Sequence, residues 1–498
     1  MRYATATTVL LIALSVLFIY IPNEGSDATS SETAPDGSVY LYDTYGSGHP
    51  NYYCEITDAD TAGNVVHIPT VLEGYDVRNI LPGAFDGCTA KCVIIPVNVK
   101  SISAGAFTGC TQLADVYFMG DRPAMDDAFP TGVGIHYLPG TTGWSTETAI
   151  TTETSDGITY AQFPDGWMAV GGTPTDGAIN IKSDIGGGKV TSVGPYSFSG
   201  TMQPSGEVER RTDIVSVSIE SGVTDIRERA FYYCNIQNIE MTDSVIHIHD
   251  EAFRSALELT DASISPSAEY IGFECYRNCQ ALTSITVPDS VRYLGDGCFY
   301  ICNSAETLKI GSGVQSIPVR GFGYCTSLTD VTFNCSPTEI KASAFYNCPS
   351  LRSISIPDSV KTIGQEAFWN NTSLTELSLG KVTSIEYGAF RNCTSLRSFD
   401  LPSTVESLGK YCFADCTKLS DIDAYGPCPV LDDTVFLNDP VTIHCSKDNY
   451  NSWNDSKADA NIKDDLNKKE FNILLIVMPV IIIAGIVLLA VVRNRRRS

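Results

Sequence analysis

The stretch LRSISIPDSVKTIGQEAFWNN, residues 351–371, contains the pattern that decides the fold. Its apolar residues Leu351, Ile354 and Ile356 are spaced by polar residues. That alternation predicts a short β-strand with one buried face. The Pro-Asp pair that follows ends the strand, because proline has no N–H to donate to a sheet and favours a turn. The chain then returns inward through an isoleucine, bends at a glycine and buries an aromatic ring.

That ring recurs at a nearly constant interval. The equivalent positions are Phe231, Phe253, Tyr276, Phe299, Phe322, Phe345, Phe368, Phe390, Phe413 and Phe436. Successive rings are 22 or 23 residues apart, and a fixed period in this range indicates a repeat solenoid. We expect one short strand per coil, with the strands of stacked coils forming a parallel sheet at a spacing of about 4.8 Å.

Cysteine is the second repeated feature of the chain. More than half of the 17 cysteines stand three residues after a ring, where the unit at 351–371 has Asn371 instead. A residue placed by the repeat is expected to be buried as a small hydrophobe, and a polar group there can satisfy buried backbone groups. Cys428 and Cys445 lie outside this pattern and flank the final coil, which makes them candidates for a disulfide. No set of cysteines and histidines in this sequence has the spacing that is typical of zinc sites.

The unit L-x-S-I-x-I-P-x-S-V-x-x-I-G-x-x-A-F-x-N-C-x-S resembles the BspA-like leucine-rich repeat family, a surface-associated branch found in host-associated microbes and some parasites. The resemblance covers most of the region between the two ends of the chain. It implies a leucine-rich-repeat solenoid and a role in binding or adhesion at the cell surface. It implies no enzymatic activity and no cofactor, and it does not name a partner.

The chain divides into segments by repeat and composition. A shorter array with rings at Phe85, Phe107 and Phe129 precedes the long one. The predicted segments are a signal peptide (1–28), a first leucine-rich-repeat array with a strand cap (39–145), a linker (146–157), a second array with an N-terminal strand cap (158–445), a polar stem (446–470), a transmembrane helix (471–492) and a basic cytoplasmic tail (493–498).

The C-terminal segment predicts the membrane topology. Phe471–Val492 has 22 residues without a charge, enough to span about 30 Å of hydrocarbon as a helix. Four arginines follow, so we expect a single-pass protein of the cell membrane with its repeats outside and its C-terminus in the cytoplasm. An uncleaved signal anchor at the N-terminus and a cleaved sorting tail at the C-terminus are the alternatives.

The outward strand positions form two columns on the predicted sheet. They are small, polar and acidic, without Trp, Tyr or Arg. The acidic candidates for a ligand face are Asp261, Asp330, Glu376, Asp400, Asp421 and Asp423. Asp400, Asp421 and Asp423 gather near the C-terminal end of the array, where oxygen ligands could bind Ca²⁺, although hydrated carboxylates are the simpler explanation. The net charge of −25 speaks against nucleic acid as a partner.

Catalytic patterns are missing from the sequence, and we do not expect an enzyme. The histidines are scattered, and His247 and His249 are interpreted as ordinary strand or turn residues. Asn370 and Asn454 head sequons and are candidates for glycosylation. We expect an adhesin or ligand-binding module whose partner is a protein or glycan on host or neighbouring cells. The alternative is a structural envelope protein that packs laterally with itself, and a signalling receptor is a weaker third.

Overall fold

The computed structural model describes residues 28–45, 53–174, 176–202, 208–456, 458 and 460–466. These residues form two compact units. The first unit takes the described residues up to Thr173 together with Ser183–Ser197 and Thr201–Glu209. The second unit takes Pro174–Lys182, Phe198–Gly200 and the described residues from Arg210 onward. Each unit contains a repeat array, as the spacing of the rings predicts.

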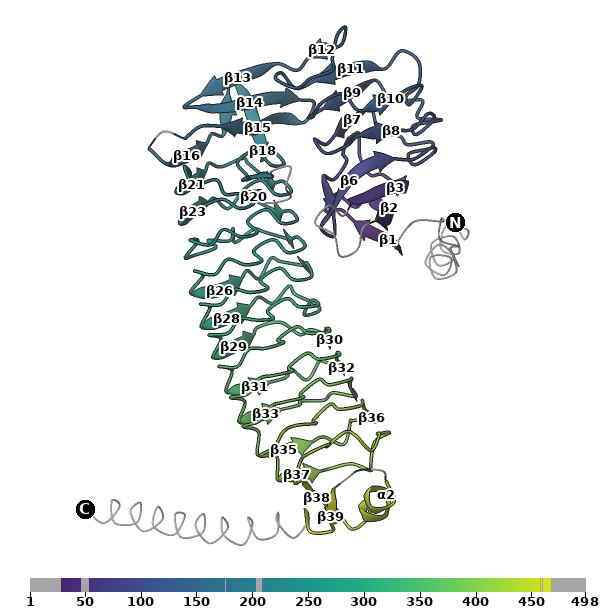
Figure 1. Ribbon diagram of the computed structural model, residues 1–498, viewed down its shortest axis with the longest axis vertical. Helices are drawn as coiled ribbons and strands as arrows, with labels where there is room; N and C mark the ends of the chain where they lie inside the picture. The colour runs from purple at the N-terminus through teal and green to yellow at the C-terminus, as the bar shows by residue number, and fades with distance from the viewer. Residues whose placement is uncertain are drawn as a thin grey trace, which may run out of the picture. The chain divides into compact units, whose positions relative to one another are not determined.

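The first unit begins with antiparallel strands and continues into parallel coils (Figure 1). One sheet contains β1 (Ala28–Thr33), β2 (Val39–Tyr45), β3 (Tyr53–Asp60), β5 (Val71–Leu72), β6 (Tyr75–Ile80), β8 (Ser101–Ile102) and β10 (Ala124–Met125). A second sheet contains β4 (Val65–His67), β7 (Cys92–Ile95), β9 (Asp115–Phe118), β11 (Gly134–Tyr137) and β12 (Thr148–Ala149). The antiparallel strands cover the open end of the coils, as solenoid ends require.

The predicted linker, 146–157, is not a plain connection, because it contains β12 and β13. The strands predicted to cap the second array also belong largely to the first unit. The strands that follow β12 in the first unit are β13 (Thr152–Ser155), β14 (Ile158–Phe163), β15 (Gly166–Gly172), β17 (Asp184–Ile185), β18 (Gly188–Val193), β19 (Thr201–Met202) and β20 (Val208–Glu209). β13, β14 and β15 pair antiparallel, and β15 then pairs parallel with β18.

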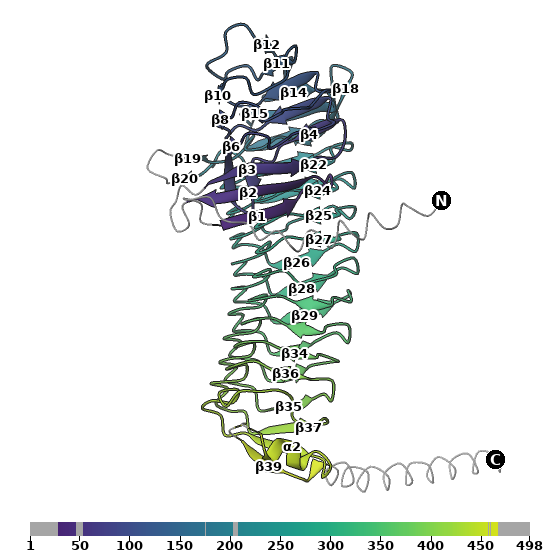
Figure 2. The same cartoon turned by 90° about the vertical axis from the view of Figure 1, so that its right-hand side faces the viewer.

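The second unit is a stack of coils from β16 to β39 (Figures 1 and 2). Its longer strands are β16 (Ala178–Ile181), β21 (Ser216–Ile219), β23 (Asn238–Met241), β26 (Ser284–Val287), β28 (Thr307–Ile310), β29 (Asp330–Phe333), β31 (Ser353–Ser355), β33 (Glu376–Ser378), β35 (Ser398–Leu401), β37 (Asp421–Ala424), β38 (Thr442–Cys445) and β39 (Asn461–Lys463). Its two-residue strands are β22 (Asp225–Ile226), β24 (His247–Ile248), β25 (Tyr270–Ile271), β27 (Tyr293–Leu294), β30 (Glu339–Ile340), β32 (Thr362–Ile363), β34 (Ser384–Ile385) and β36 (Ser407–Leu408). The pairs between successive coils are parallel, as predicted.

A column of stacked rings runs through the core of each unit. In the second unit the ring centroids of consecutive coils lie between 5.0 Å, for Phe368 and Phe390, and 6.0 Å, for Phe413 and Phe436. In the first unit Phe85 and Phe107 stack at 4.7 Å. These rings are buried, except that Phe129 at the end of the first array is partly buried. The interval in the sequence therefore marks the core of the solenoid.

In most coils the Cys or Asn that closes the coil makes a hydrogen bond to the preceding coil. Cys416 Sγ lies 3.2 Å from the carbonyl oxygen of Phe390, the ring residue of the preceding coil. Asn371 occupies the same position and donates to the carbonyl oxygens of Phe345 at 2.9 Å and Phe368 at 2.7 Å. Equivalent thiol contacts are made by Cys110, Cys279, Cys302, Cys325, Cys348 and Cys393. The predicted role of this position, to satisfy a buried carbonyl, is confirmed.

The expected disulfide between Cys428 and Cys445 does not form, and both residues are free thiols. The sulfur of Cys445 is buried 3.4 Å from the carbonyl oxygen of Lys463. The sulfur of Cys428 lies 3.4 Å from the carbonyl oxygen of Pro429. Each thiol is therefore held by its own local contact, and flanking positions in the sequence do not make the two sulfurs meet.

The beginning of the predicted polar stem is folded rather than extended. β39 adds a parallel strand to β38, and the short helix α2 (Tyr450–Asn454) packs against the end of the stack. Trp453 is 1% exposed, and its Nε1 donates to the carbonyl oxygen of Gly426 at 3.1 Å. The stem as far as Leu466 is therefore a C-terminal cap. The predicted signal peptide, transmembrane helix and cytoplasmic tail lie outside the described residues, within which no helix has the length and apolar character to cross a membrane.

The last coil closes with Asp439, three residues after Phe436, in place of the usual Cys or Asn. Both carboxylate oxygens are buried without a hydrogen-bond partner among the described residues. Burial, and then the nearby charge of Asp415, raise the pKa of Asp439 to about 8. A carboxylate cannot donate to a carbonyl as Asn371 does, so the position favours the protonated acid.

Asp439→Asn is therefore expected to stabilise the protein at pH 8 by about 1–2 kcal/mol, because it restores a donor. The folded-state pKa is above the unfolded value of about 3.9, so the native stability contributed by this group falls as pH rises through this interval. The gain should be seen in urea unfolding at pH 8 and should disappear near pH 4.

The matched control is Asn371→Asp, which places the carboxylate in a middle coil and should destabilise at pH 8. An equal effect of Asp439→Asn at both pH values would contradict this assignment.

Candidate functional site

The predicted ligand face lies on the exposed side of the second unit's longer strands. Asp330 and Glu376 are exposed and begin β29 and β33, and Asp400 is exposed in β35. Asp421 and Asp423 are half-buried on β37. The alternation in these strands follows the predicted pattern, with the intervening residues in the core. The acidic side chains are spread over several coils and do not form one cluster.

The C-terminal acidic group comes together only in part. Asp400 and Asp423 are register partners on adjacent strands, as predicted, and with Asp421 they line a hollow of about 180 Å³. Asp421 already accepts a hydrogen bond from His444, whose Nε2 lies 2.9 Å from Oδ1. The other ring nitrogen of His444 is 2.6 Å from Asp465. Among the described residues, the sets of metal-ligating atoms that all lie within 4.8 Å of one another do not include these three carboxylates. Calcium binding at this position stays a prediction.

Asp261 lies where the sheet is interrupted. β23 pairs with β21, and β26 pairs with β28, but β23 and β26 belong to separate sheets. The intervening segment 261–264 forms no strand, and Ser263 has a φ of 42°, in the left-handed region. The Ser263 N–H donates to Asp261 Oδ1 at 2.8 Å. The result is a turn where neighbouring coils have a strand.

The coil that contains this turn has the same length as the next coil. Leu259 precedes Leu282 by 23 residues, and Ala268 precedes Val291 by 23. Ser265, whose carbonyl accepts the N–H of Ala268, occupies the place of Pro288, whose carbonyl accepts the N–H of Val291. A turn therefore replaces the strand within an unchanged coil length, and we call this turn the bulge.

A hollow of about 490 Å³ lies on the sheet face beside the bulge. It is lined by Asp261, Ala262, Ser263, Ile264, Pro266, Ser284, Thr286, Pro288 and Asp289. We call it the bulge hollow. Asp289 Oδ1 accepts the N–H of Ser312 at 2.7 Å, which holds this carboxylate at the rim. The bulge hollow therefore combines two carboxylates, three hydroxyls and apolar proline surface.

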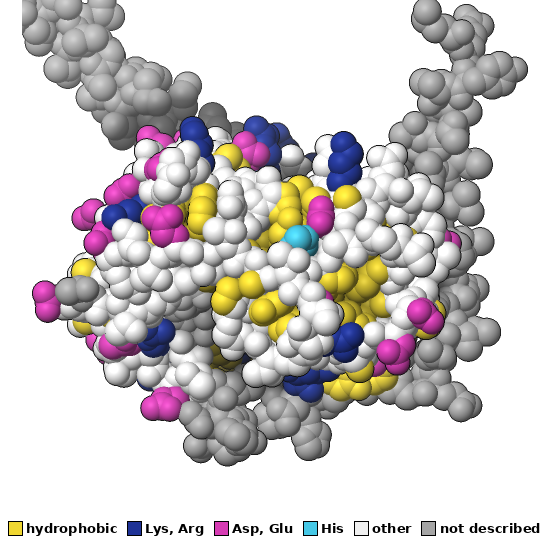
Figure 3. Space-filling view, turned by 90° about the horizontal axis from the view of Figure 1, so that it is seen from above, with side chains coloured by type: hydrophobic (Ala, Val, Ile, Leu, Met, Phe, Trp, Pro, Cys, Tyr) yellow, Lys and Arg dark blue, Asp and Glu magenta, His cyan; other side chains and the backbone are white. Residues whose placement is uncertain are grey.

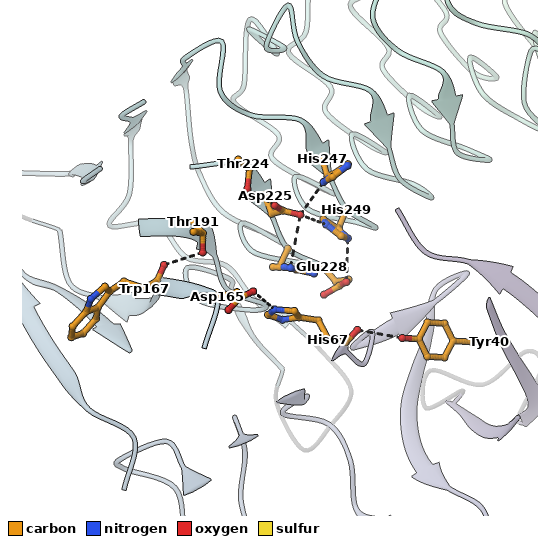
Figure 4. Close-up of polar contacts among 11 residues, drawn as sticks. Tyr40, His67, Asp165, Trp167, Thr191, Thr224, Asp225, Glu228, His247 and His249 are labelled. Carbon is orange, nitrogen blue, oxygen red and sulfur yellow. Dashed lines mark hydrogen bonds and ion pairs between the residues drawn. The ribbon is translucent and has the colours of Figure 1, made fainter. Parts of the chain in front are cut away.

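A second arrangement joins polar side chains from two adjacent coils of the second unit (Figure 4). Asp225 in β22 is the register partner of His247 in β24. His247 Nδ1 lies 3.1 Å and His249 Nε2 lies 3.2 Å from the same atom, Asp225 Oδ1. His249 Nδ1 is 3.3 Å from a carboxylate oxygen of Glu228. We call Asp225, His247 and His249 the histidine cluster.

The electrostatics around His249 favour its charged form. Burial opposes the charge, but hydrogen bonds to Asp225 and Glu228 outweigh burial and raise the pKa of His249 to about 9. Beyond it, buried Arg229 pairs with Glu251 through Nε at 2.8 Å, and Arg254 bridges Glu251 and Glu274. The histidine cluster thus begins a column of paired charges along the coils.

His247 lies in strand β24 and His249 follows it directly, as interpreted from the sequence, but that interpretation did not include their contacts with Asp225. The signal that could have revealed the cluster is the repeat itself. Asp225 precedes His247 by 22 residues, the length of one coil, so the two side chains must stack. Motif spacing within one coil cannot show contacts that arise between coils.

The first unit has a polar hollow of its own, of about 510 Å³. Its lining includes Asp115, Tyr117 and His136, and His136 Nε2 lies 2.8 Å from Asp115 Oδ1 while its ring stacks on Tyr117 at 4.5 Å. His67 Nε2 is 2.7 Å from Asp165 Oδ2 (Figure 4). Seen toward the end that carries β11 and β12, the unit shows hydrophobic side chains at the surface among acidic ones (Figure 3).

The glycosylation candidates differ in their surroundings. Asn370 has a φ of 63°, and its side-chain amide hydrogen-bonds with both Asn347 and Asn392 in the neighbouring coils. Modification of Asn370 would break that ladder. Asn454 is exposed at the end of α2. Both sites remain predictions.

A family model for the BspA type leucine rich repeat region matches residues 65–128, 209–329 and 293–420, in six copies, and together these cover more than half of the chain. The chain belongs to this family. The resemblance read from the repeated unit is confirmed, and so is the leucine-rich-repeat solenoid. No curated protein sequence matches the chain.

Several solved structures are similar to this BspA-type chain. A leucine-rich repeat protein of T. pallidum is 23% identical over 40% of this chain and 91% of its own, with a TM-score of 0.36. A leucine-rich cell surface protein of Faecalibacterium prausnitzii is 19% identical over 86% and 97%, with a TM-score of 0.28. The pneumococcal vaccine antigen PcpA is 14% identical over 87% and 98%, with a TM-score of 0.37.

The strain at the bulge gives a stability prediction. Ser263→Val should destabilise the protein by about 1–2 kcal/mol, because a β-branched residue strongly disfavours a positive φ. Ser284→Val, on the exposed face of β26, should be neutral or slightly stabilising, since valine favours strands. Urea unfolding of both variants measures the difference, and equal effects would show that the left-handed turn is absent in solution.

Proposed function

We propose that the chain is a ligand-binding module of the cell surface, with adhesion to host or neighbouring cells as its role. The observation that carries this proposal is the bulge hollow, a polar recess beside a left-handed turn that interrupts an otherwise regular sheet. Strained backbone beside a recess is typical of sites that contact ligands. The interior cysteines and rings are fully used in packing, which leaves recognition to the surface.

The chemistry of the bulge hollow favours a ligand rich in hydrogen-bond donors. Asp261 and Asp289 each use one oxygen for a backbone N–H, which leaves their second oxygens for a ligand. Hydroxyls of Ser284 and Thr286 lie beside them. Sugar hydroxyls and the basic side chains of a protein both supply such donors.

The binding test probes glycan and matrix-protein arrays with the full chain in detergent, as wild type and as the double variant Asp261→Asn, Asp289→Asn. We expect the wild type to bind a donor-rich glycan or a basic protein, and the double variant to bind at least about tenfold more weakly, a loss of about 1.4 kcal/mol.

Asp243→Asn, on an exposed turn of the same unit, is the matched control and should bind as wild type. Equal binding by the wild type and the double variant would place recognition elsewhere. Self-assembly without binding to the arrays would support the structural envelope role instead.

Display at the membrane is part of the same proposal and is supported by the uncharged segment Phe471–Val492 and the four arginines that follow it. Removal of residues 471–498 should release the chain from the membrane fraction into the medium. Protease added to intact cells should digest the repeats of the wild type while a C-terminal tag stays protected. Release of the unmodified chain, or protected repeats, would contradict this topology.

A further inference from the structure

We propose that the histidine cluster, Asp225, His247 and His249, is a binding site for a transition-metal dication of the zinc type. Its ligand atoms, one carboxylate oxygen and two imidazole nitrogens, all lie within 4.8 Å of one another. This donor set favours Zn²⁺ and its first-row neighbours over Ca²⁺ or Mg²⁺, which prefer oxygen alone. The site differs in place and chemistry from the bulge hollow and does not depend on the proposed function.

The distances are those of a site that needs little rearrangement. His247 Nδ1 and His249 Nε2 lie 3.1 Å and 3.2 Å from Asp225 Oδ1. In a tetrahedral zinc site with bonds of about 2.0–2.1 Å, neighbouring ligand atoms are separated by about 3.3–3.4 Å. The two separations that involve Asp225 Oδ1 therefore differ from zinc geometry by only a few tenths of an ångström, and the two imidazole nitrogens lie within 4.8 Å of each other.

The outer contacts of the cluster also match a metal site. Glu228 lies 3.3 Å from His249 Nδ1 and is 8% exposed, so its carboxylate can hold the ring with Nε2 turned to the common centre. A carboxylate behind a ligating histidine orients the ring and increases its basicity, which is the usual arrangement around protein-bound zinc. Glu228 and Asp225 together neutralise the charge of a dication.

The ligands are placed by the stack and remain within reach of solvent. Asp225 and His247 are register partners on neighbouring coils, so the backbone holds them at a fixed separation. The side chains of Asp225 and His247 are 17% and 27% exposed, whereas that of His249 is 6% exposed. An ion can enter from the exposed side and reach the buried imidazole.

One nearby cation competes with the ion. Arg227 Nη2 lies 3.9 Å from Asp225 Oδ1, longer than a hydrogen bond, and its buried Nε has no partner among the described residues. The guanidinium is therefore weakly held at this carboxylate. Zinc binding breaks the hydrogen bonds that His247 and His249 make to Asp225. The ring protons that form these hydrogen bonds are then released to solvent.

The ion would cross-link two coils whose ligands are 22 residues apart in sequence. Since binding to the native state alone stabilises that state, zinc should raise the melting temperature of the full chain.

The experiment uses the full chain in detergent, stripped with EDTA and kept reduced. Isothermal titration with ZnCl₂ should show zinc binding by the wild type. In His247→Ala and in Asp225→Asn, zinc should bind at least about 100-fold more weakly. His136→Ala is the matched control, because His136 also pairs with an aspartate but belongs to the first unit. The melting temperature of each metal-free variant shows that it is folded.

Cobalt substitution separates this site from adventitious binding by the free thiols. Co²⁺ in the histidine cluster should give weak visible bands without the intense near-ultraviolet thiolate absorption, and His249→Gln should remove those bands. Equal zinc affinity and stoichiometry in the wild type and in His247→Ala would overturn the proposal, as would a cobalt spectrum dominated by thiolate in the wild type. No stoichiometric zinc binding by the wild type at micromolar concentration would overturn it as well.

Discussion

The fold depends on the contact between the residue that closes one coil and the carbonyl of the ring residue in the coil before it. Each ring must be buried for the coils to stack, and its backbone turns sharply there, so its carbonyl is withdrawn from water. A buried carbonyl without a donor costs about 1–3 kcal/mol. The thiol of Cys416 and the amide of Asn371 remove that cost while adding little volume.

The same constraint explains why so many cysteines can stay unpaired. A thiol that already faces a carbonyl 3 to 3.5 Å away is not aimed at another sulfur, and burial raises the pKa of the Cys279 thiol to about 12. A thiol with so high a pKa supplies almost no thiolate for oxidation. At this position cysteine acts as a small hydrogen-bond donor that can also be buried in an apolar core.

The sequence predicted the parts of the structure that repeat and missed the parts that arise between repeats. The ring interval predicted the aromatic column, and the alternation around Ile354 predicted the faces of the strands. The bulge at Ser263 was missed because its coil has the same length as the next coil, so the ring interval does not reveal it. The contact of His247 with Asp225 was missed because Asp225 lies one coil away. The end of the stack was misjudged too, since Trp453 in a polar segment gives no repeat signal.

Departures from the repeat are thus the places where this molecule can acquire chemistry. A regular coil commits its rings, thiols and apolar strand residues to packing, and a change at any of them lowers stability. A side chain that points outward from a strand is not needed for packing. Because the coils stack in register, every coil has an equivalent outward position. Two side chains that would be unremarkable alone become neighbours when they occupy equivalent positions in consecutive coils, as Asp225 and His247 do. In a solenoid, a binding site therefore becomes visible in the sequence when the coils are aligned and the side chains at equivalent positions of neighbouring coils are compared.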